Sequence, residues 1–268
     1  IKRTFGYDER TLSNLWRTSI ENAYRPYARD TVNQPIGKRV IDTRNAGEMN
    51  VAPAVSPDGK YIAFLSEKEL LSIDLFLAEA QTGKILRKLT SKTTNTHIDE
   101  FSFIESAGAW SPDSRRFAFS AFSGGRNKLL VVDVASGKNV LTQAMGQVEE
   151  FSNLTWGPNG DEVAFAGPKE GQTDLYSYNL KTRNLTQLTN DAYSDNQPAY
   201  SSDGRKIVFT SDRTTQNAAD PVHISYNLAV LDLDTRTITD ITVFDGANNL
   251  NPQFSADNQS VYFLSNRD

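Results

Sequence analysis

The stretch Pro53-Ala-Val-Ser-Pro-Asp-Gly-Lys-Tyr-Ile-Ala-Phe64 decides the fold, because four variants of it follow along the chain. The variants occupy residues 109–119, 154–165, 198–209 and 252–263. Their turn aspartate or asparagine recurs at steps of 55, 46, 44 and 54 residues. A repeat near this length indicates an array of similar structural units.

Each unit is predicted to be a four-stranded antiparallel meander. In the first copy, residues 52–55 form a short inner strand, and Ser56-Pro-Asp-Gly59 forms a tight turn in which Pro presets φ and Gly accepts a positive φ. Residues 60–66 read as a second strand with alternating polar and apolar side chains. Residues 74–79 and 85–90 are the predicted third and fourth strands.

Repeated four-stranded sheets bury their faces against one another in a ring, so we predict an all-β fold, a β-propeller over residues 37–268. The blades are expected to start near residues 52, 108, 153, 197 and 251, and the last one is truncated after its second strand. Residues 37–43 read as a lone fourth strand that completes the last blade. The two longest steps predict insertions over residues 91–106 and 213–225.

The N-terminal residues 1–36 differ from the repeats. Apolar side chains that include Leu12, Trp16 and Ile20 fall at helical spacing, which predicts a short amphipathic α-helix over residues 9–25 that Asp8 caps. We interpret residues 1–36 as this helix and a linker, the tail of an upstream domain.

Composition narrows the class of protein. The 268 residues carry a net charge of −5 and no long basic stretch, which argues against a nucleic-acid partner. No apolar run reaches the roughly 18 residues that a membrane-spanning helix needs, and the chain has no cysteine. The chain opens at Ile1 rather than Met and stops within a repeat, so we expect it to be a fragment.

The motif Ser56-Pro-Asp-Gly-Lys-Tyr-Ile-Ala-Phe64 resembles the repeat of TolB-type β-propellers. The predicted third strands at Asp74-Leu-Phe76 and Asp174-Leu-Tyr176 also resemble that repeat. The likeness covers about residues 37–268. It implies a propeller that is six-bladed when complete and partial here, in a periplasmic or otherwise extracytoplasmic protein of the bacterial envelope. Ser114 and Asn258 depart from the pattern, because they replace the turn glycine.

A narrower likeness involves Ser106-Ala-Gly-Ala-Trp-Ser-Pro-Asp113 and Leu188-Thr-Asn-Asp-Ala-Tyr193. These phrases resemble large bacterial exported proteins in which a metallopeptidase-like domain precedes the propeller. The zinc motif His-Glu-x-x-His of such peptidases is absent from this chain, so the likeness transfers no peptidase activity to it.

The segments that enter the inner strands are the candidate binding site. In a propeller these segments ring one mouth of the central channel, and here they are rich in side chains that suit hydrogen bonding to a peptide, a ligand or a cation. The alternative is that polar residues simply line a wet channel. The candidate residues are Glu48, Asn50, Glu149, Glu150, Asp195, Asn196, Asn249 and Asn251.

No cofactor or metal is expected. The five turn positions 58, 113, 159, 203 and 257 hold Asp or Asn, which close turns by bonding their own backbone. Asp74 and Asp174 make calcium binding a minor possibility, because a calcium site needs a cluster of oxygen ligands and the sequence shows none around them. His97 and His223 are the only histidines, which is too few for zinc.

The sequence therefore predicts a non-catalytic scaffold that binds a protein or peptide partner. The alternative is an accessory domain that gates substrate for a larger exported peptidase, whose catalytic domain lies outside this chain. A third possibility is that the propeller itself is a hydrolase, with channel-mouth carboxylates such as Glu149 and Asp195 as acid and base, but no spacing selects a pair.

Overall fold

The computed structural model describes residues 2–26, 37–69, 72–90, 100–101, 108–169, 171–213, 225–241, 244 and 246–267. The chain divides into two compact units, residues 1–39 and residues 40–268. The first unit holds α1 (Lys2–Phe5) and α2 (Glu9–Tyr24). Asp8 caps α2 as predicted, because its carboxylate accepts a hydrogen bond from the backbone N–H of Thr11 at 2.8 Å.

The second unit is a series of antiparallel sheets, one for each copy of the repeat. Blade 1 contains β1 (Asn50–Val55), β2 (Tyr61–Ser66), β3 (Asp74–Glu79) and β4 (Ile85–Thr90). Blade 2 contains β6 (Ala109–Trp110), β7 (Arg116–Ser123), β8 (Arg126–Asp133) and β9 (Asn139–Ala144), with β5 (Glu100–Phe101) also paired to β7.

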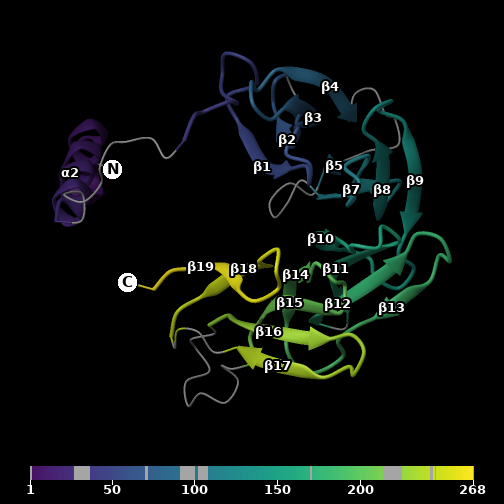
Figure 1. Cartoon of the computed structure of the whole chain (residues 1–268). Coiled ribbons are helices and arrows are strands. Elements are labelled where there is room, and N and C mark those ends of the chain that lie inside the picture. The colour runs from purple at the N-terminus through teal and green to yellow at the C-terminus, as the bar shows by residue number, and fades with distance from the viewer. Residues whose placement is uncertain are drawn as a thin grey trace. The chain divides into compact units, whose positions relative to one another are not determined.

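Blade 3 contains β10 (Ser152–Trp156), β11 (Glu162–Lys169), β12 (Gln172–Asn179) and β13 (Leu185–Gln187). Blade 4 contains β14 (Asp195–Tyr200), β15 (Lys206–Ser211), β16 (Asn227–Asp232) and β17 (Ile238–Ile241). Blade 5 contains β18 (Asn249–Phe254) and β19 (Val261–Ser265). The five sheets follow one another in chain order around an arc (Figure 1), and each inner strand contacts the sheet before it. The all-β propeller prediction is confirmed.

The core forms between neighbouring blades. Along β7, Phe117 and Phe119 face blade 1, whereas Ala118 between them faces blade 3. The middle strands are therefore buried on both faces, which corrects the alternation predicted for residues 60–66: every side chain from Ile62 to Ser66 is buried. A strand enclosed on both faces carries a continuous apolar run rather than an alternating one.

Residues 37–43 pair with no strand among the described residues, so their role as the closing strand of the last blade stays a prediction. Val40 and Ile41 pack on a cluster of blade 1 that contains Phe64 and Phe76. The side-chain amide of Asn45 donates to the carbonyl oxygens of Val40 at 2.7 Å and Gly83 at 3.0 Å. These contacts attach the segment to blade 1 through side chains, without strand pairing.

Four of the five inner-strand turns share the same Ser–Asp hydrogen bond. Ser56 Oγ donates to the Asp58 carboxylate at 2.7 Å, and the same carboxylate oxygen accepts from the backbone N–H of Lys60 at 3.1 Å. The Ser hydroxyl and then the Lys60 N–H lower the pKa of Asp58 below its usual value. The equivalent Ser–Asp bonds are Ser111–Asp113, Ser201–Asp203 and Ser255–Asp257. These aspartates therefore close turns, as their spacing predicts.

The two residues that replace the turn glycine link neighbouring blades. Ser114 and Asn258 both have a φ of 58°, in the left-handed region that glycine favours. Ser114 Oγ accepts from the backbone N–H of Asp58 at 3.1 Å, and Asn258 Oδ1 accepts from the backbone N–H of Ser202 at 2.8 Å. Each departure from the repeat thus offsets its backbone strain with a bond to the preceding blade.

This geometry predicts that Ser114→Ala lowers the free energy of unfolding by about 1–2 kcal/mol, because the left-handed backbone remains and the Asp58 N–H loses its acceptor. Ser114→Gly loses the same bond but relieves the backbone, so we expect it to be the more stable variant of the two. Urea unfolding of both variants measures the difference. Equal stability of Ser114→Ala and the parent would refute the inter-blade bond.

Candidate functional site

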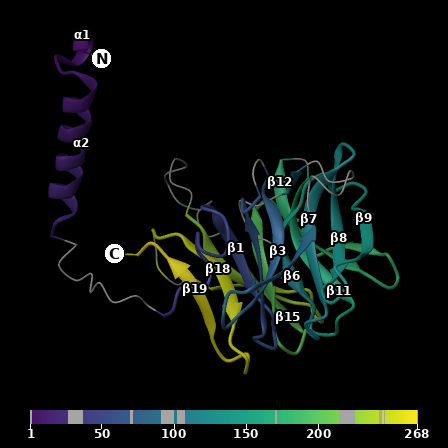
Figure 2. The same ribbon diagram turned by 90° about the horizontal axis from the view of Figure 1, so that it is seen from above.

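The connections of the second unit lie at the two ends of its strands (Figure 2). In an antiparallel meander, the first-to-second and third-to-fourth strand turns share one end, which we call the turn face. The second-to-third strand connections and the segments between blades share the opposite end, which we call the loop face. All eight candidate residues lie in or next to loop-face segments.

A repeated clamp holds the loop face in three blades. The residue after the second strand accepts, through its side chain, a hydrogen bond from the backbone N–H just before the inner strand. In blade 4, Asp212 accepts from Ser194 at 2.8 Å. The equivalent pairs are Glu67 with Met49 at 3.0 Å in blade 1 and Asn266 with Asn248 at 2.7 Å in blade 5.

Three of the candidate residues occupy equivalent positions directly after these clamps. Asn50 is half-buried, and its amide nitrogen donates to Gly47 O at 2.6 Å. Asn249 is fully buried and donates to Asn227 Oδ1, on the neighbouring blade, at 2.7 Å. Asp195 is fully buried in the cluster described next. These three side chains bind other parts of the protein itself.

The other candidates are more accessible. Glu48 and Asn251 are exposed, and Asn196 is half-buried on β14. Glu149 and Glu150 are exposed and adjacent to each other, and they line a hollow between blades 2 and 3. Of the eight residues, these two glutamates line one hollow, whereas the other six belong in pairs to blades 1, 4 and 5.

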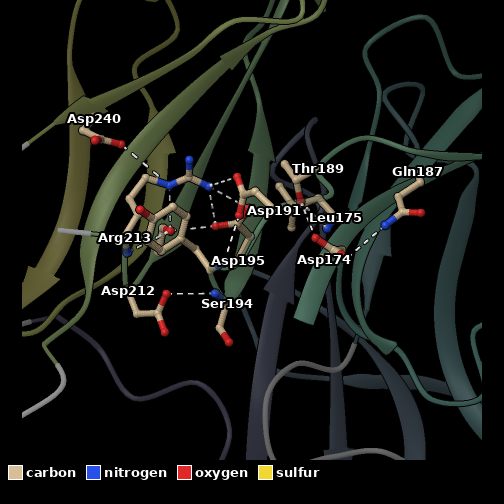
Figure 3. Close-up of polar contacts among 12 residues, drawn as sticks. Asp174, Leu175, Gln187, Thr189, Asp191, Ser194, Asp195, Asp212, Arg213 and Asp240 are labelled. Carbon is tan, nitrogen blue, oxygen red and sulfur yellow. Dashed lines mark hydrogen bonds and ion pairs between the residues drawn. The ribbon is translucent and has the colours of Figure 1, made fainter. Parts of the chain in front are cut away.

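Arg213 lies at the centre of a polar cluster on the loop face (Figure 3). Its guanidinium nitrogen Nη2 binds both carboxylate oxygens of Asp195 at 2.9 Å and lies 3.2 Å from Asp191. Its Nε donates to Ser211 Oγ at 2.9 Å and lies 3.6 Å from Asp240. One arginine therefore joins the segment before β14 to β14, β15 and β17.

Aromatic rings complete the Arg213 cluster. The guanidinium carbon lies 5.1 Å from the ring centre of Tyr193 and 5.5 Å from that of Phe209. A guanidinium within about 6 Å of a ring face is attracted by the ring's electron density. The Arg213 side chain is only 9% exposed. The cluster therefore stabilises the loop face through contacts within the protein.

Burial raises the pKa of Asp195 to about 6, which outweighs the opposing effects of the Ser211 hydroxyl and the Arg213 charge. The neighbouring Asp191 carboxylate also raises it. The pair with Arg213 is therefore ionised at neutral pH, and Asp195 takes up a proton below about pH 6.

Asp174 and Asp74, the two possible calcium ligands, are engaged otherwise. Asp174 accepts hydrogen bonds from Gln187 at 2.9 Å and Thr189 at 3.3 Å (Figure 3), and burial raises its pKa. Asp74 accepts from Ser72 at 2.9 Å and lies 3.4 Å from Lys88 Nζ. Within the described ranges, no group of three or more His, Asp or Glu side chains could hold a metal ion. His97 and His223 lie outside the described residues.

The hollow beside Glu149 and Glu150 has a volume of about 880 Å³. It lies between the β7–β8 hairpin of blade 2 and the β11–β12 hairpin of blade 3, above the segment that links β9 to β10. Its charged lining also includes Arg126 and Lys169, one on each hairpin.

Sequence reasoning missed the hairpin side of this hollow. The segment that enters β10 pointed to Glu149 and Glu150, but Phe122, Arg126 and Lys169 were not candidates. The available signal was Ser123-Gly-Gly125, because a pair of glycines is typical of a two-residue hairpin turn. The structure confirms that turn: Ser123 pairs with Arg126, and both glycines have positive φ.

The Asp195 pKa predicts a specific pH dependence of stability. In the unfolded chain this carboxyl titrates near pH 4, whereas in the folded protein it titrates near pH 6. Between these values the native state holds more protons, so stability rises as pH falls. From pH 7.5 to 5.0, we expect the wild type to gain about 1 kcal/mol relative to Asp195→Asn, measured by urea unfolding.

Asp257→Asn is the matched control. Asp257 lies in a turn where the Ser255 hydroxyl lowers its pKa. Its stability difference from the wild type should therefore stay constant over the same pH interval. A constant difference for Asp195→Asn as well would show that Asp195 titrates at its ordinary pKa.

Comparison with known proteins agrees with this architecture. The sequence model of the TolB beta propeller domain matches residues 103–219. A protein TolB homolog of Chlorobium chlorochromatii is 30% identical over 182 residues, which are 66% of this chain and 40% of the relative. A Tol-Pal system protein TolB of Ruthia magnifica is 33% identical over 83 residues, which are 31% of this chain and 19% of the relative. The chain thus spans less than half the length of either relative.

Solved structures share the fold. The crystal structure of TolB from Acinetobacter baumannii matches 86% of this chain and 51% of its own, with a TM-score of 0.63 and 21% identity. A puromycin-hydrolyzing peptidase of Mycobacterium tuberculosis matches 76% of this chain and 29% of its own, with a TM-score of 0.53 and 15% identity. At these identities the structural matches establish the fold alone.

In the described part of the chain, no helix has both the length and the apolar character needed to cross a membrane. The repeated sheets, the matching domain model and the two relatives agree with one another. The chain therefore contains a TolB-type β-propeller domain.

Proposed function

We propose that this chain is a non-catalytic scaffold that binds a protein or peptide partner through its loop face, in the periplasm or another part of the bacterial envelope. The envelope location is inferred from the likeness to a Tol-Pal system protein. The single observation that carries the proposal is the internal fastening of the loop face by Arg213 and by the Glu67, Asp212 and Asn266 clamps. A surface held rigid before binding loses less conformational entropy when a partner docks.

The same observation argues against a hydrolase in the propeller. Asp195, one of the two carboxylates considered as an acid or base, is fully buried and bound to Arg213. A general acid or base must reach the substrate proton within hydrogen-bond distance. Asp195 therefore serves the fold rather than a reaction.

A second candidate function is an accessory domain that gates substrate for an exported peptidase. It is favoured by the likeness to the puromycin-hydrolyzing peptidase, in which the matched part makes up 29% of the chain. This role would be supported if the full-length protein shows peptidase activity and loses it when a catalytic motif outside this chain is mutated. A full-length protein that binds partners without such a motif supports the scaffold.

Site-specific photo-crosslinking of the full-length protein in its own cells tests the scaffold. A photoreactive amino acid at Glu48, Glu149 or Asn251 should give discrete protein adducts, because these exposed side chains lie on the loop face. The matched positions Gln81 and Thr182 are exposed on the turn face and should give few or none. Equal adducts from both faces, or none from the loop face, would overturn the proposal.

A further inference from the structure

We propose that the hollow between the β7–β8 and β11–β12 hairpins, the inter-hairpin hollow, binds an extended segment of a protein partner in which an apolar side chain lies between an acidic and a basic one. This inference rests on the proposed scaffold function and assigns one site and one ligand chemistry to it.

Two hairpin extensions create the hollow. The strands β7, β8, β11 and β12 have eight residues each, whereas the equivalent strands β2, β3, β15 and β16 have six. Aligning the central phenylalanines Phe119 and Phe165 with Phe64 places the additional residues at the loop-face ends of the strands. These additional residues include Phe122, Arg126, Asn127, Pro168 and Lys169, all of which line the hollow.

The hollow opens where the loop-face clamp is missing. In blades 1 and 4, the residue after the second strand is Glu67 or Asp212, whose carboxylate binds the backbone before the inner strand. The equivalent residues in blades 2 and 3 are Phe122 and Pro168, which have no side-chain acceptor. Two adjacent blades therefore share the same departure from the repeat.

Four charged side chains line the described part of the hollow. Arg126 and Lys169 stand on the two hairpins, and Glu149 and Glu150 stand on the segment between them. Among the described residues, none of these four side chains forms an ion pair with another. The described lining of the hollow thus presents two charges of each sign, none of them in an ion pair with another described residue.

The hollow also has an apolar component. Met145 and Val148 line it and are buried, and Phe122 is 43% exposed at its edge. Asn127 also lines the hollow; its amide nitrogen donates to Phe151 O at 3.4 Å, and its buried Oδ1 has no hydrogen-bond partner among the described residues. An apolar ligand side chain would therefore find a complementary surface between the charged walls.

The β7–β8 wall of the hollow is a short hairpin with a tight turn. The β7–β8 hairpin turns through Gly124 and Gly125, whose φ values of 60° and 76° suit a two-residue hairpin turn. The volume of about 880 Å³ falls within the range of sites that enclose sizeable ligands. Such a hollow binds without first having to order a long loop.

The charge pattern selects the class of ligand. A polyanion such as a nucleic acid would meet Glu149 and Glu150 beside the two basic residues, and like charges placed together disfavour binding. A peptide segment can place one carboxylate near Arg126 or Lys169 and one ammonium near the glutamates. Its apolar side chain between them would meet Phe122.

Selection from a displayed random peptide library tests the site, with the full-length protein as the target. Enriched peptides should carry an apolar residue flanked by an acidic and a basic one. Gln147→Trp fills the hollow that Gln147 lines and should weaken these peptides by about tenfold or more. Gln81→Trp makes the same change on the turn face and should leave their affinity unchanged.

Charge variants test the chemistry with the selected peptides as probes. Arg126→Gln and Glu149→Gln should each weaken binding by roughly two- to fivefold, as expected for exposed ion pairs. A peptide whose acidic residue is replaced by Gln should lose its sensitivity to Arg126→Gln alone. Selection of no peptide, or of peptides that bind Gln147→Trp equally well, would overturn the inference.

These outcomes are separable from those of the scaffold proposal. If crosslinks form at Glu48 and Asn251, outside the hollow, but no peptide depends on Gln147, the scaffold stands and the inter-hairpin hollow is not its site. If selected peptides bind but free dipolar amino acids displace them completely at millimolar concentration, the hollow takes a small zwitterion, and the peptide assignment falls.

Discussion

The constraint on which the rest of the structure depends is that the middle strands of each blade are apolar on both faces. Phe117 and Phe119 need a neighbour on one side of blade 2, and Ala118 needs one on the other. A single four-stranded sheet cannot bury both faces, so each blade is stable only between others. This requirement orders the blades around an arc and brings loops distant in sequence onto one surface (Figure 1).

Polar groups divide into local and long-range roles. The Ser56–Asp58 bond closes a turn within one copy of the repeat. The bonds of Ser114 to Asp58 and of Arg213 to Asp191, Asp195 and Asp240 join separate elements. Removing one partner of a buried pair leaves an uncompensated charge. The loop face is therefore stiffened in part by Asp195, one of the residues that the sequence assigned to a candidate binding site.

Function is expected where the repeat is broken rather than where it is kept. Blades 1, 4 and 5 use an acid or an amide after the second strand to fasten the loop face, whereas blades 2 and 3 carry Phe122 and Pro168 there. The fold tolerates the loss because the hairpins continue for two more residues on each strand and close tightly. The hollow and its charged lining are the result.

The sequence by itself determined the blades, their turns, the capped helix and the family likeness, because these depend on contacts between residues close in the chain. It did not determine the fate of Asp195 and Asn249, which read as channel-mouth ligands but are buried against Arg213 and Asn227. Nor did it predict that Val40 and Ile41 would pack on a cluster of blade 1. Only the tertiary structure decided these points and the hollow between two hairpins, because they depend on which residues of neighbouring blades meet, and a repeat pattern carries no information about those partners.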